Sequence, residues 1–316
     1  MPDYTIHYRR VVALEDLASQ SWDTVLSAYN GSERVLRVFN ELRAGRKHWL
    51  IHREYQFDVA EWPTDGAVFA PKSENEADFL AEYLAAAGSA LGVGSLCVDI
   101  TGFMRPHLLL LVRMLRAAGV NQFEALYTDP IRYAKSENTT FTDGPVLEVR
   151  QVAGYEGSHV ADSGTSDLLV IGAGYDHELV QWVSDSKMHA RKLLMFGLPS
   201  LQPDMYQESR LRIARASEAV GEAADADLIF APANNPFVTA QELSFAVEAE
   251  RRSGRGVSNL YLSPLGTKPQ VLGFGLFYLR ECEGKEASII FPYAGRYSRE
   301  TTHGISRIWL YSIDLG

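Results

Sequence analysis

Short, nearly continuous apolar runs alternate with segments of helical period from about residue 95 onward. The runs cover 95–100, 123–128, 167–172, 192–197, 227–232, 260–264 and 288–293. Between them lie segments typical of helices, near 105–118, 176–186, 205–218, 236–252 and 268–280. Apolar runs covered on both faces and joined by helices indicate βαβ units. The pattern therefore predicts an α/β protein with a Rossmann-like, mostly parallel sheet and helices on both faces.

The chain before residue 95 and the segment near residue 155 follow this rhythm less clearly. We expect a helix near 33–44, a strand near 48–52, a Pro/Gly loop at 62–72 and an Ala-rich helix at 75–87. A turn with an alternating strand (141–155) and a Gly/Ser-rich stretch (157–167) interrupt the pattern. They predict a boundary near 155–166, between an N-terminal α/β half (1–155) without an assigned role and a Rossmann-like, ligand-binding half (166–316).

Composition and charge narrow the classes of function. The chain has 316 residues, and 30 Lys and Arg against 40 Asp and Glu give a net charge of −10, which argues against a broad nucleic-acid surface. Cys97 and Cys282 cannot build a disulfide framework or a zinc cluster. The first residues lack a signal peptide, and no apolar run is long enough to cross a bilayer. We expect a cytoplasmic protein with no metal, no cofactor and no membrane contact.

The turn after the run at 260–264 carries the most informative chemistry. Ser263 ends the strand, Gly266, Thr267 and Lys268 form a turn, and Pro269 opens a helix. Proline in the first helical turn beside a lysine is typical of a helix N-terminus that binds phosphate or carboxylate. Any βα turn favours Gly and Pro, so ordinary turn chemistry explains the composition equally well.

This turn resembles the Gly-Thr-Lys signature of CARF domains, the CRISPR-associated Rossmann-fold family. Gly266, Thr267 and Lys268 match the signature, while Leu265 and Gln270 replace its first Gly and its Met. The resemblance covers about eight residues and the apolar helix that follows. It implies a homodimeric sensor in a prokaryotic defence or stress system. Its ligand would be a nucleotide-derived small molecule, often a cyclic oligoadenylate. Since no effector domain is recognisable in the sequence, we expect a separate effector protein, with an N-terminal effector in this chain as the alternative.

Two further βα turns resemble the first in their chemistry. Thr101 and Gly102 precede Arg105-Pro106, which aligns with Lys268-Pro269 when Val98 is set against Tyr261. Either a diverged duplication or, with better odds, independent βα units that share a turn chemistry would produce this match. We expect Arg105 and Lys268 to face one crevice, because parallel strands of one sheet end at the same edge.

The third turn places Gly172 and Gly174 between a strand and a helix. It lacks the third glycine of a dinucleotide fingerprint, since Glu178 occupies that position. The glycines would line the anion site together with Lys268 and Arg105, and Arg296 between Tyr293 and Tyr297 suits stacking on a base. A surface loop explains the Arg296 segment equally well.

The candidate catalytic groups are few. Asp99 and Asp129 follow strand ends and are weak candidates for acid/base or metal chemistry, with structural hydrogen bonding favoured for both. Arg46 and His52 have the spacing of a ribonuclease motif that belongs on a helix, but their segment predicts a strand. Ser263 and His303 lack an orienting acid. We therefore favour a sensor or adaptor, with a hydrolase or transferase acting on a nucleotide or phosphorylated sugar as the rival. A sensor that slowly degrades its own ligand would join the two.

Overall fold

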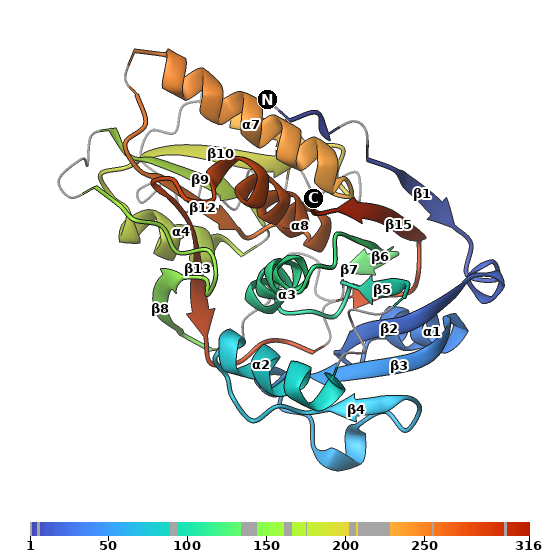
Figure 1. The fold of residues 1–316 in the computed structure, drawn as a ribbon. Helices are drawn as coiled ribbons and strands as arrows, with labels where there is room; N and C mark the ends of the chain where they lie inside the picture. Colours follow the sequence, from blue (N-terminus) through green and yellow to red (C-terminus); the bar gives the residue numbers. More distant parts are fainter. Residues whose placement is uncertain are drawn as a thin grey trace. The chain divides into compact units, whose positions relative to one another are not determined.

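The computed structural model describes residues 2–4, 7–88, 94–133, 144–160, 166–174, 176–201, 207, 228–254, 256–299 and 302–316. The chain forms two compact units (Figure 1). One comprises His7–Asp143 and Arg296–Gly316, and we call it the Arg105 unit. The other comprises Met1–Ile6 and Gly144–Gly295, and we call it the Lys268 unit.

The Arg105 unit is built on a seven-stranded sheet in the order β1-β15-β6-β5-β2-β3-β4. Its strands are β1 (Arg9–Val12), β2 (Ser21–Tyr29), β3 (Arg43–Ile51), β4 (Ala67–Phe69), β5 (Leu96–Asp99), β6 (Gln122–Asp129) and β15 (Arg307–Asp314). Strands β2 to β6 are parallel, whereas β15 runs antiparallel to β6 and β1 antiparallel to β15. Its α-helices in the described part are α1 (Glu33–Glu41), α2 (Glu76–Ala87) and α3 (Arg105–Ala117).

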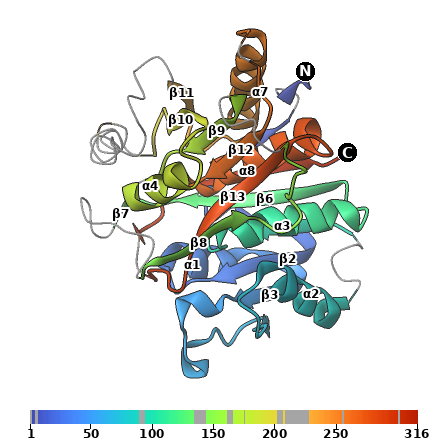
Figure 2. The ribbon, with the colours of Figure 1, turned by 90° about the vertical axis from the view of Figure 1, so that its left-hand side faces the viewer.

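The Lys268 unit is built on a six-stranded sheet in the order β11-β10-β9-β12-β13-β8, whose neighbouring strands Figure 2 shows side by side. Its strands are β8 (Val146–Gln151), β9 (Leu168–Gly172), β10 (Arg191–Gly197), β11 (Leu228–Ala231), β12 (Leu260–Pro264) and β13 (Ala287–Ala294). All are parallel except β8, which is antiparallel to β13. Its described α-helices are α4 (His177–Ser186), α7 (Pro236–Arg252) and α8 (Lys268–Phe277).

Both sheets have one topology. If the five parallel strands of each unit are counted along the chain, their order across the sheet is 3-2-1-4-5, with an antiparallel strand beside the fifth. This is the Rossmann-like order, in which the chain changes direction between the first and fourth strands. That crossover lies between β2 and β5 in the Arg105 unit, and between β9 and β12 in the Lys268 unit. The predicted α/β, Rossmann-like fold with two halves is confirmed.

Alternating strand residues place helices on both faces of the Arg105 sheet. Trp49 of β3 stacks on Phe39 of α1 with ring centroids 3.7 Å apart, while the adjacent His48 accepts or donates a hydrogen bond of 3.0 Å with the hydroxyl of Tyr83 in α2. Consecutive strand residues point to opposite faces, so α1 and α2 cover opposite faces of the sheet.

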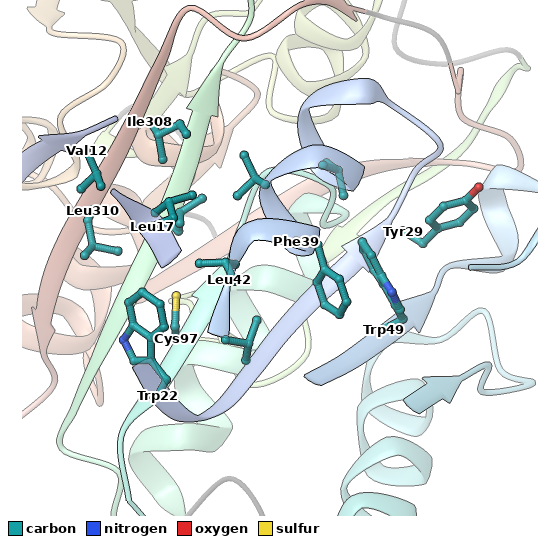
Figure 3. Close-up of a cluster of buried hydrophobic side chains, with 14 of the residues drawn as sticks. Val12, Leu17, Trp22, Tyr29, Phe39, Leu42, Trp49, Cys97, Ile308 and Leu310 are labelled. Atoms are coloured by element: carbon teal, nitrogen blue, oxygen red, sulfur yellow. The ribbon is translucent and has the colours of Figure 1, made fainter. Parts of the chain in front are cut away.

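The core under α1 explains why this helix forms (Figure 3). Val35, Val38, Phe39 and Leu42 recur at the spacing of one helical face, and each is at most 2% exposed. They join a cluster that includes Leu310 of β15. Burying a side chain of this size contributes about 1.5–3 kcal/mol to stability. Because Leu310 lies in this cluster, strand β15 is part of the core of the Arg105 unit.

The two units divide the chain differently from the predicted halves. Strand β8, expected in the N-terminal half, pairs with β13 in the Lys268 unit. The chain start also belongs to that unit, where Tyr4 is fully buried and its hydroxyl donates a 3.0 Å hydrogen bond to Glu281 Oε1. The chain end returns to the Arg105 unit as β15. Pairings between distant strands, invisible to local composition, cause these differences.

The seven predicted apolar strands are present, but six other strands in the described part of the chain were missed. These are β1, β2, β4, β15 and the two-residue strands β7 (Arg132–Tyr133) and β14 (Thr302–His303). In β2, Thr24 and Ser27 are buried polar residues that interrupt the apolar run. The last of the seven predicted strands, at 288–293, is followed along the chain by a further buried strand, β15, whose Leu310 is 1% exposed. The expected helix at 205–218 lies almost entirely outside the described residues.

Candidate functional site

The predicted site residues fall into two groups, one in each unit. The Lys268 unit contains Gly172, Gly174, Ser263, Gly266, Thr267 and Lys268, and the Arg105 unit contains Asp99, Thr101, Arg105, Asp129 and Arg296. The argument that Arg105 and Lys268 share one edge is wrong in its premise, because β5 and β12 belong to different sheets. Each residue nevertheless opens the helix after the fourth parallel strand of its own unit, with proline second, so the proposed alignment of the two turns matches the topology.

The turn before α8 is closed by a capping box. Thr267 is the N-cap: its Oγ1 accepts a 3.4 Å hydrogen bond from Gln270 N, and Gln270 Oε1 accepts one of 3.2 Å from Thr267 N. Thr267 Oγ1 also donates to the carbonyl of Ala233. Since Pro269 has no N–H and the Gln270 N–H is capped, this helix end offers fewer backbone donors for an anion than the sequence indicated.

Two features of the α8 start still favour an anionic or polar ligand. Lys268 is its first residue, at the positive end of the helix dipole. Gln270 is 2% exposed, and its Nε2 has no hydrogen-bond partner among the residues that the structure describes. A buried amide donor without a partner carries a desolvation cost, which a ligand acceptor would offset. Gly266 leaves room for this amide, because a Cβ there would lie 2.4 Å from Gln270 Oε1.

The glycines after β9 have packing roles. A Cβ on Gly174 would lie 2.3 Å from the carbonyl oxygen of Leu265, so the two turns at the crossover touch through this position. A Cβ on Gly172 would lie 3.0 Å from the ring of Phe274 in α8. Asp176 caps α4 through a 3.4 Å hydrogen bond from Leu179 N, and Glu178 lies in the first turn. These carboxylates oppose an anion at the start of α4.

Ser263 points away from the α8 face. Pro264 is the register partner of Gly172, whose missing Cβ faces α8, so the preceding Ser263 faces the other side of the sheet. The Ser263 side chain is fully buried, and its Oγ has no hydrogen-bond partner. His303 belongs to the other unit. The strand geometry therefore separates Ser263 from the Lys268 turn with which the sequence grouped it.

In the Arg105 unit, Asp99 and Thr101 connect the ends of three strands. Asp99 Oδ2 accepts a 2.8 Å hydrogen bond from Ser27 Oγ in β2, and its Oδ1 accepts one of 3.0 Å from Thr101 N. Thr101 Oγ1 accepts a 3.1 Å hydrogen bond from Thr128 N in β6. Burial raises the pKa of Asp99, against the lowering effect of these hydrogen bonds. Both carboxyl oxygens have structural hydrogen bonds.

Asp129 is also held by a structural contact. Its Oδ2 accepts a 2.7 Å hydrogen bond from Trp309 Nε1 in β15, and the residue is 5% exposed. In the described part of the chain, no group of three or more His, Cys, Asp or Glu side chains is arranged to hold a metal ion. The geometry thus assigns Asp99 and Asp129 to the sheet's hydrogen bonding, the role that the sequence favoured.

Sequence reasoning missed Arg34, the second residue of α1. Arg34 is only 8% exposed, and its Nη1 donates to the carbonyl of Thr128 at the end of β6. Its guanidinium lies 5.8 Å from the centre of the Tyr127 ring. Arg105 is also 8% exposed at the start of α3. The Arg-Pro turn had already indicated Arg105 in the sequence, whereas no motif indicated Arg34.

A second buried polar cluster follows β3. The rings of His52 and His107 lie 4.6 Å apart, and His107 Nε2 is 4.0 Å from Glu54 Oε1. Burial, and then the nearby carboxylates of Glu74 and Glu76, raise the pKa of Glu54 to about 7. This carboxyl therefore titrates in the range that suits a general acid or base.

The structure bears on two arginine segments singled out in the sequence. In the first, Arg296 is exposed, whereas Arg299 makes the contacts expected of an arginine among aromatic rings. Arg299 lies 4.2 Å from the Phe57 ring centre and its Nη1 is 3.0 Å from Glu61 Oε1. Arg46 lies within β3, and His52 directly follows it, so the strand predicted for this segment is confirmed and the helical ribonuclease motif is not formed.

Comparison with models of known protein families finds no match for this chain, and comparison with curated proteins finds none either. None of the helices described has the length and apolarity needed to cross a membrane. The fold and the two crossover edges are thus the basis for any functional assignment.

Proposed function

We propose that the Lys268 unit binds a nucleotide-derived anion at the start of α8, and that the chain acts as a sensor or adaptor. The observation that carries this proposal is the buried Gln270 amide, two residues from Lys268, whose Nε2 finds no hydrogen-bond partner in the described part of the chain. Both lie beside the β9–β12 crossover, the edge at which doubly wound sheets bind ligands.

The chemistry of these two side chains suits a phosphorylated ligand. The Lys268 ammonium is a compact point charge that attracts a phosphate oxygen, and the Gln270 amide supplies N–H donors for a second acceptor. The amide oxygen is already held by Thr267 N at 3.2 Å, which orients the NH₂ group. The capping box thus positions the amide for binding while it closes the helix end.

The resemblance of Gly266-Thr267-Lys268 to CARF domains supports a nucleotide signal such as a cyclic oligoadenylate. Within this proposal the chain forms a homodimer in the cytoplasm, serves a defence or stress response, and passes its signal to a separate effector. The dimer is what the resemblance implies, and the separate effector is expected because no effector domain is recognisable in the sequence. Binding should persist far better than any turnover, because Asp99 and Asp129 are occupied by structural hydrogen bonds.

Native mass spectrometry of protein purified without added ligand, followed by nucleotide extraction, identifies the candidate. Titration of that compound then compares wild type with Lys268→Ala. Loss of one charge-assisted contact should weaken binding by about ten- to hundredfold. Lys285→Ala is the matched control, because Lys285 is an exposed lysine of the same unit. Equal affinities of wild type and Lys268→Ala would remove Lys268 from the site.

The second candidate function is an enzyme acting on a nucleotide or phosphorylated sugar. It is favoured by Glu54, whose pKa burial raises to about 7, next to His107. Incubation with linear and cyclic oligoadenylates and common nucleotides, with and without Mg²⁺ or Mn²⁺, tests it by chromatography. Rapid multiple turnover that Glu54→Gln abolishes would favour the enzyme, and turnover abolished by Asp99→Asn or Asp129→Asn with binding retained would reinstate those carboxylates.

A further inference from the structure

A short segment of the Lys268 unit lies at the beginning of strands β12 and β13. It covers residues 157–160, which connect toward β9, and we call it the strap. A Cβ on Gly157 would lie 2.1 Å from the carbonyl oxygen of Ala287, the first residue of β13. The strap backbone is therefore packed directly against this strand. Within the strap, the side chain that faces the sheet is that of the half-buried His159.

Two side chains hold the strap through hydrogen bonds. Asn259, directly before β12, accepts from Val160 N at 2.9 Å and donates to Val160 O at 3.0 Å. The Asn259 amide also donates to Asp167 Oδ1 at 2.8 Å. His159 Nε2 shares a hydrogen bond of 2.9 Å with Ser288 Oγ in β13. An amide does not ionise, whereas an imidazole gains a proton near neutral pH, so His159 is the contact that a proton can change.

The imidazole also lies on an aromatic ring. The ring centroids of His159 and Tyr261 are 4.6 Å apart. Tyr261 and Ser288 are register partners in β12 and β13, so their side chains point to the same face of the sheet. Lys187, the C-cap of α4, places its Nζ 4.1 Å from the centre of the same Tyr261 ring. Protonation of His159 would therefore bring a second cation to a ring that Lys187 already contacts.

The charged groups around His159 come from three elements. They are Lys187 at the end of α4, Asp167 before β9 and Glu286 before β13. Burial is the largest influence and lowers the pKa of His159. The Lys187 ammonium acts in the same direction, while the Asn259 amide and the two carboxylates oppose it. Since the pKa is lowered overall, the imidazole binds a proton more readily when the strap has left the sheet.

We propose that His159 is a pH-dependent latch, which holds the strap on the sheet when neutral and releases it when protonated. In the neutral form the ring bonds to Ser288 and packs on Tyr261. A proton places a charge beside Lys187 in a site that is partly removed from water, and this charge is better solvated once the strap opens. Opening should increase as the pH falls through 6.5, the ordinary pKa of histidine. This latch does not depend on the function proposed for the start of α8.

Hydrogen exchange of the full chain, followed by mass spectrometry from about pH 5 to 8, tests the latch. The readout is the protection of a peptide that ends at Val160, whose N–H is held by Asn259, after division by the intrinsic exchange rate at each pH. Protection in wild type should be constant above about pH 7.5 and fall as the pH is lowered through 6.5. His159→Gln keeps an amide that can bond to Ser288 but gains no proton, so its protection should not fall.

His189→Gln is the matched control, because His189 is an exposed histidine of the same unit and its variant should show the wild-type fall. Lys187→Met removes the neighbouring cation. The pKa of His159 under the closed strap should then rise toward its ordinary value, so the loss of protection at low pH should be smaller than in wild type. A merely structural role of Lys187 would lower protection equally at every pH.

Three results would overturn the latch. Wild-type protection could be the same at both ends of the pH range, His159→Gln could show the wild-type fall, or His189→Gln could abolish it. If His159→Gln does not fold, the comparison of wild type with Lys187→Met decides. A pH dependence that is as large in Lys187→Met as in wild type then contradicts the proposal.

Discussion

The two crossover edges share a topology but treat their helix starts in opposite ways. In the Lys268 unit, Thr267 caps α8 and Asp176 caps α4 with side-chain oxygens. In the Arg105 unit, Ser32 and Met104 provide no such cap, and two buried arginines occupy the edge. One fold can therefore cap its helix starts with side chains or leave them without a side-chain cap, and the choice depends on a few residues.

This comparison separates structural from binding roles. Where a side chain fills the helix end, the glycines around it are explained by packing, as for Gly174 against Leu265. Where such caps are absent, the first N–H groups of the helix have no side-chain acceptor from the N-cap residue, as in α1 and α3. The equivalent turns that open with Arg105-Pro106 and Lys268-Pro269 are thus alike in sequence and different in what they leave exposed to a ligand.

The largest predicted effect concerns the glycine at each crossover. A Cβ on Gly102 would lie 1.9 Å from the carbonyl oxygen of Ala28 in β2, and one on Gly174 would lie 2.3 Å from that of Leu265. Gly102→Ala and Gly174→Ala should each reduce the free energy of unfolding by about 3 kcal/mol or more, because backbone must move. Chemical denaturation measures this. Gly295→Ala is the control, since its nearest contact is 3.8 Å away. If either variant were as stable as wild type, the close approach of backbone at that glycine would be contradicted.

The next effect concerns the buried acid of the Arg105 unit. The pKa of Glu54 is about 7 in the folded chain against 4.5 as its ordinary value, so the folded state retains a proton that the unfolded state releases. The stability due to this proton is fully present below about pH 4.5 and is lost as the pH rises to 7. Glu54→Gln should therefore gain on the order of 2 kcal/mol relative to wild type between pH 4.5 and 8.

Denaturation curves across this pH range measure the gain. Glu33→Gln is the control for the chemical change itself, because it replaces a glutamate whose side chain is 51% exposed by the same amide. Parallel stability profiles of wild type and Glu54→Gln would show that Glu54 ionises alike in both states, and would also weaken the second candidate function.

The smallest effect tests the capping contrast directly. Thr267→Val removes a side-chain cap and should lower the free energy of unfolding by about 1 kcal/mol. Ser32→Ala should cost only a few tenths of a kcal/mol, since Ser32 makes no capping hydrogen bond to α1. Urea unfolding of the two variants ranks them. A cost for Ser32→Ala equal to that of Thr267→Val would mean that the two helix starts are stabilised alike.

Local sequence patterns were enough to predict the parallel strands with apolar faces and the helices opened by proline. These features are local: continuous apolar runs at 168–172 or 260–264 predict buried strands, and Pro106 and Pro269 favour the first helical turn wherever they occur. The Gly-Thr-Lys turn was found for the same reason. The sequence pattern did not predict strand β2, because its buried Thr24 and Ser27 are polar residues typical of a surface.

Which strands share a sheet, and which charges are buried, depends on tertiary contacts. The pairing of β15 with β6, and of β8 with β13, joins segments through backbone hydrogen bonds that no local pattern encodes. Arg34 and Arg37 lie one helical turn apart and look equivalent in the sequence, yet only Arg34 is buried, because its side of α1 faces the strand ends. Burial depends on contacts between residues far apart along the chain, so the charge that is left for a ligand appears only once the sheet is assembled.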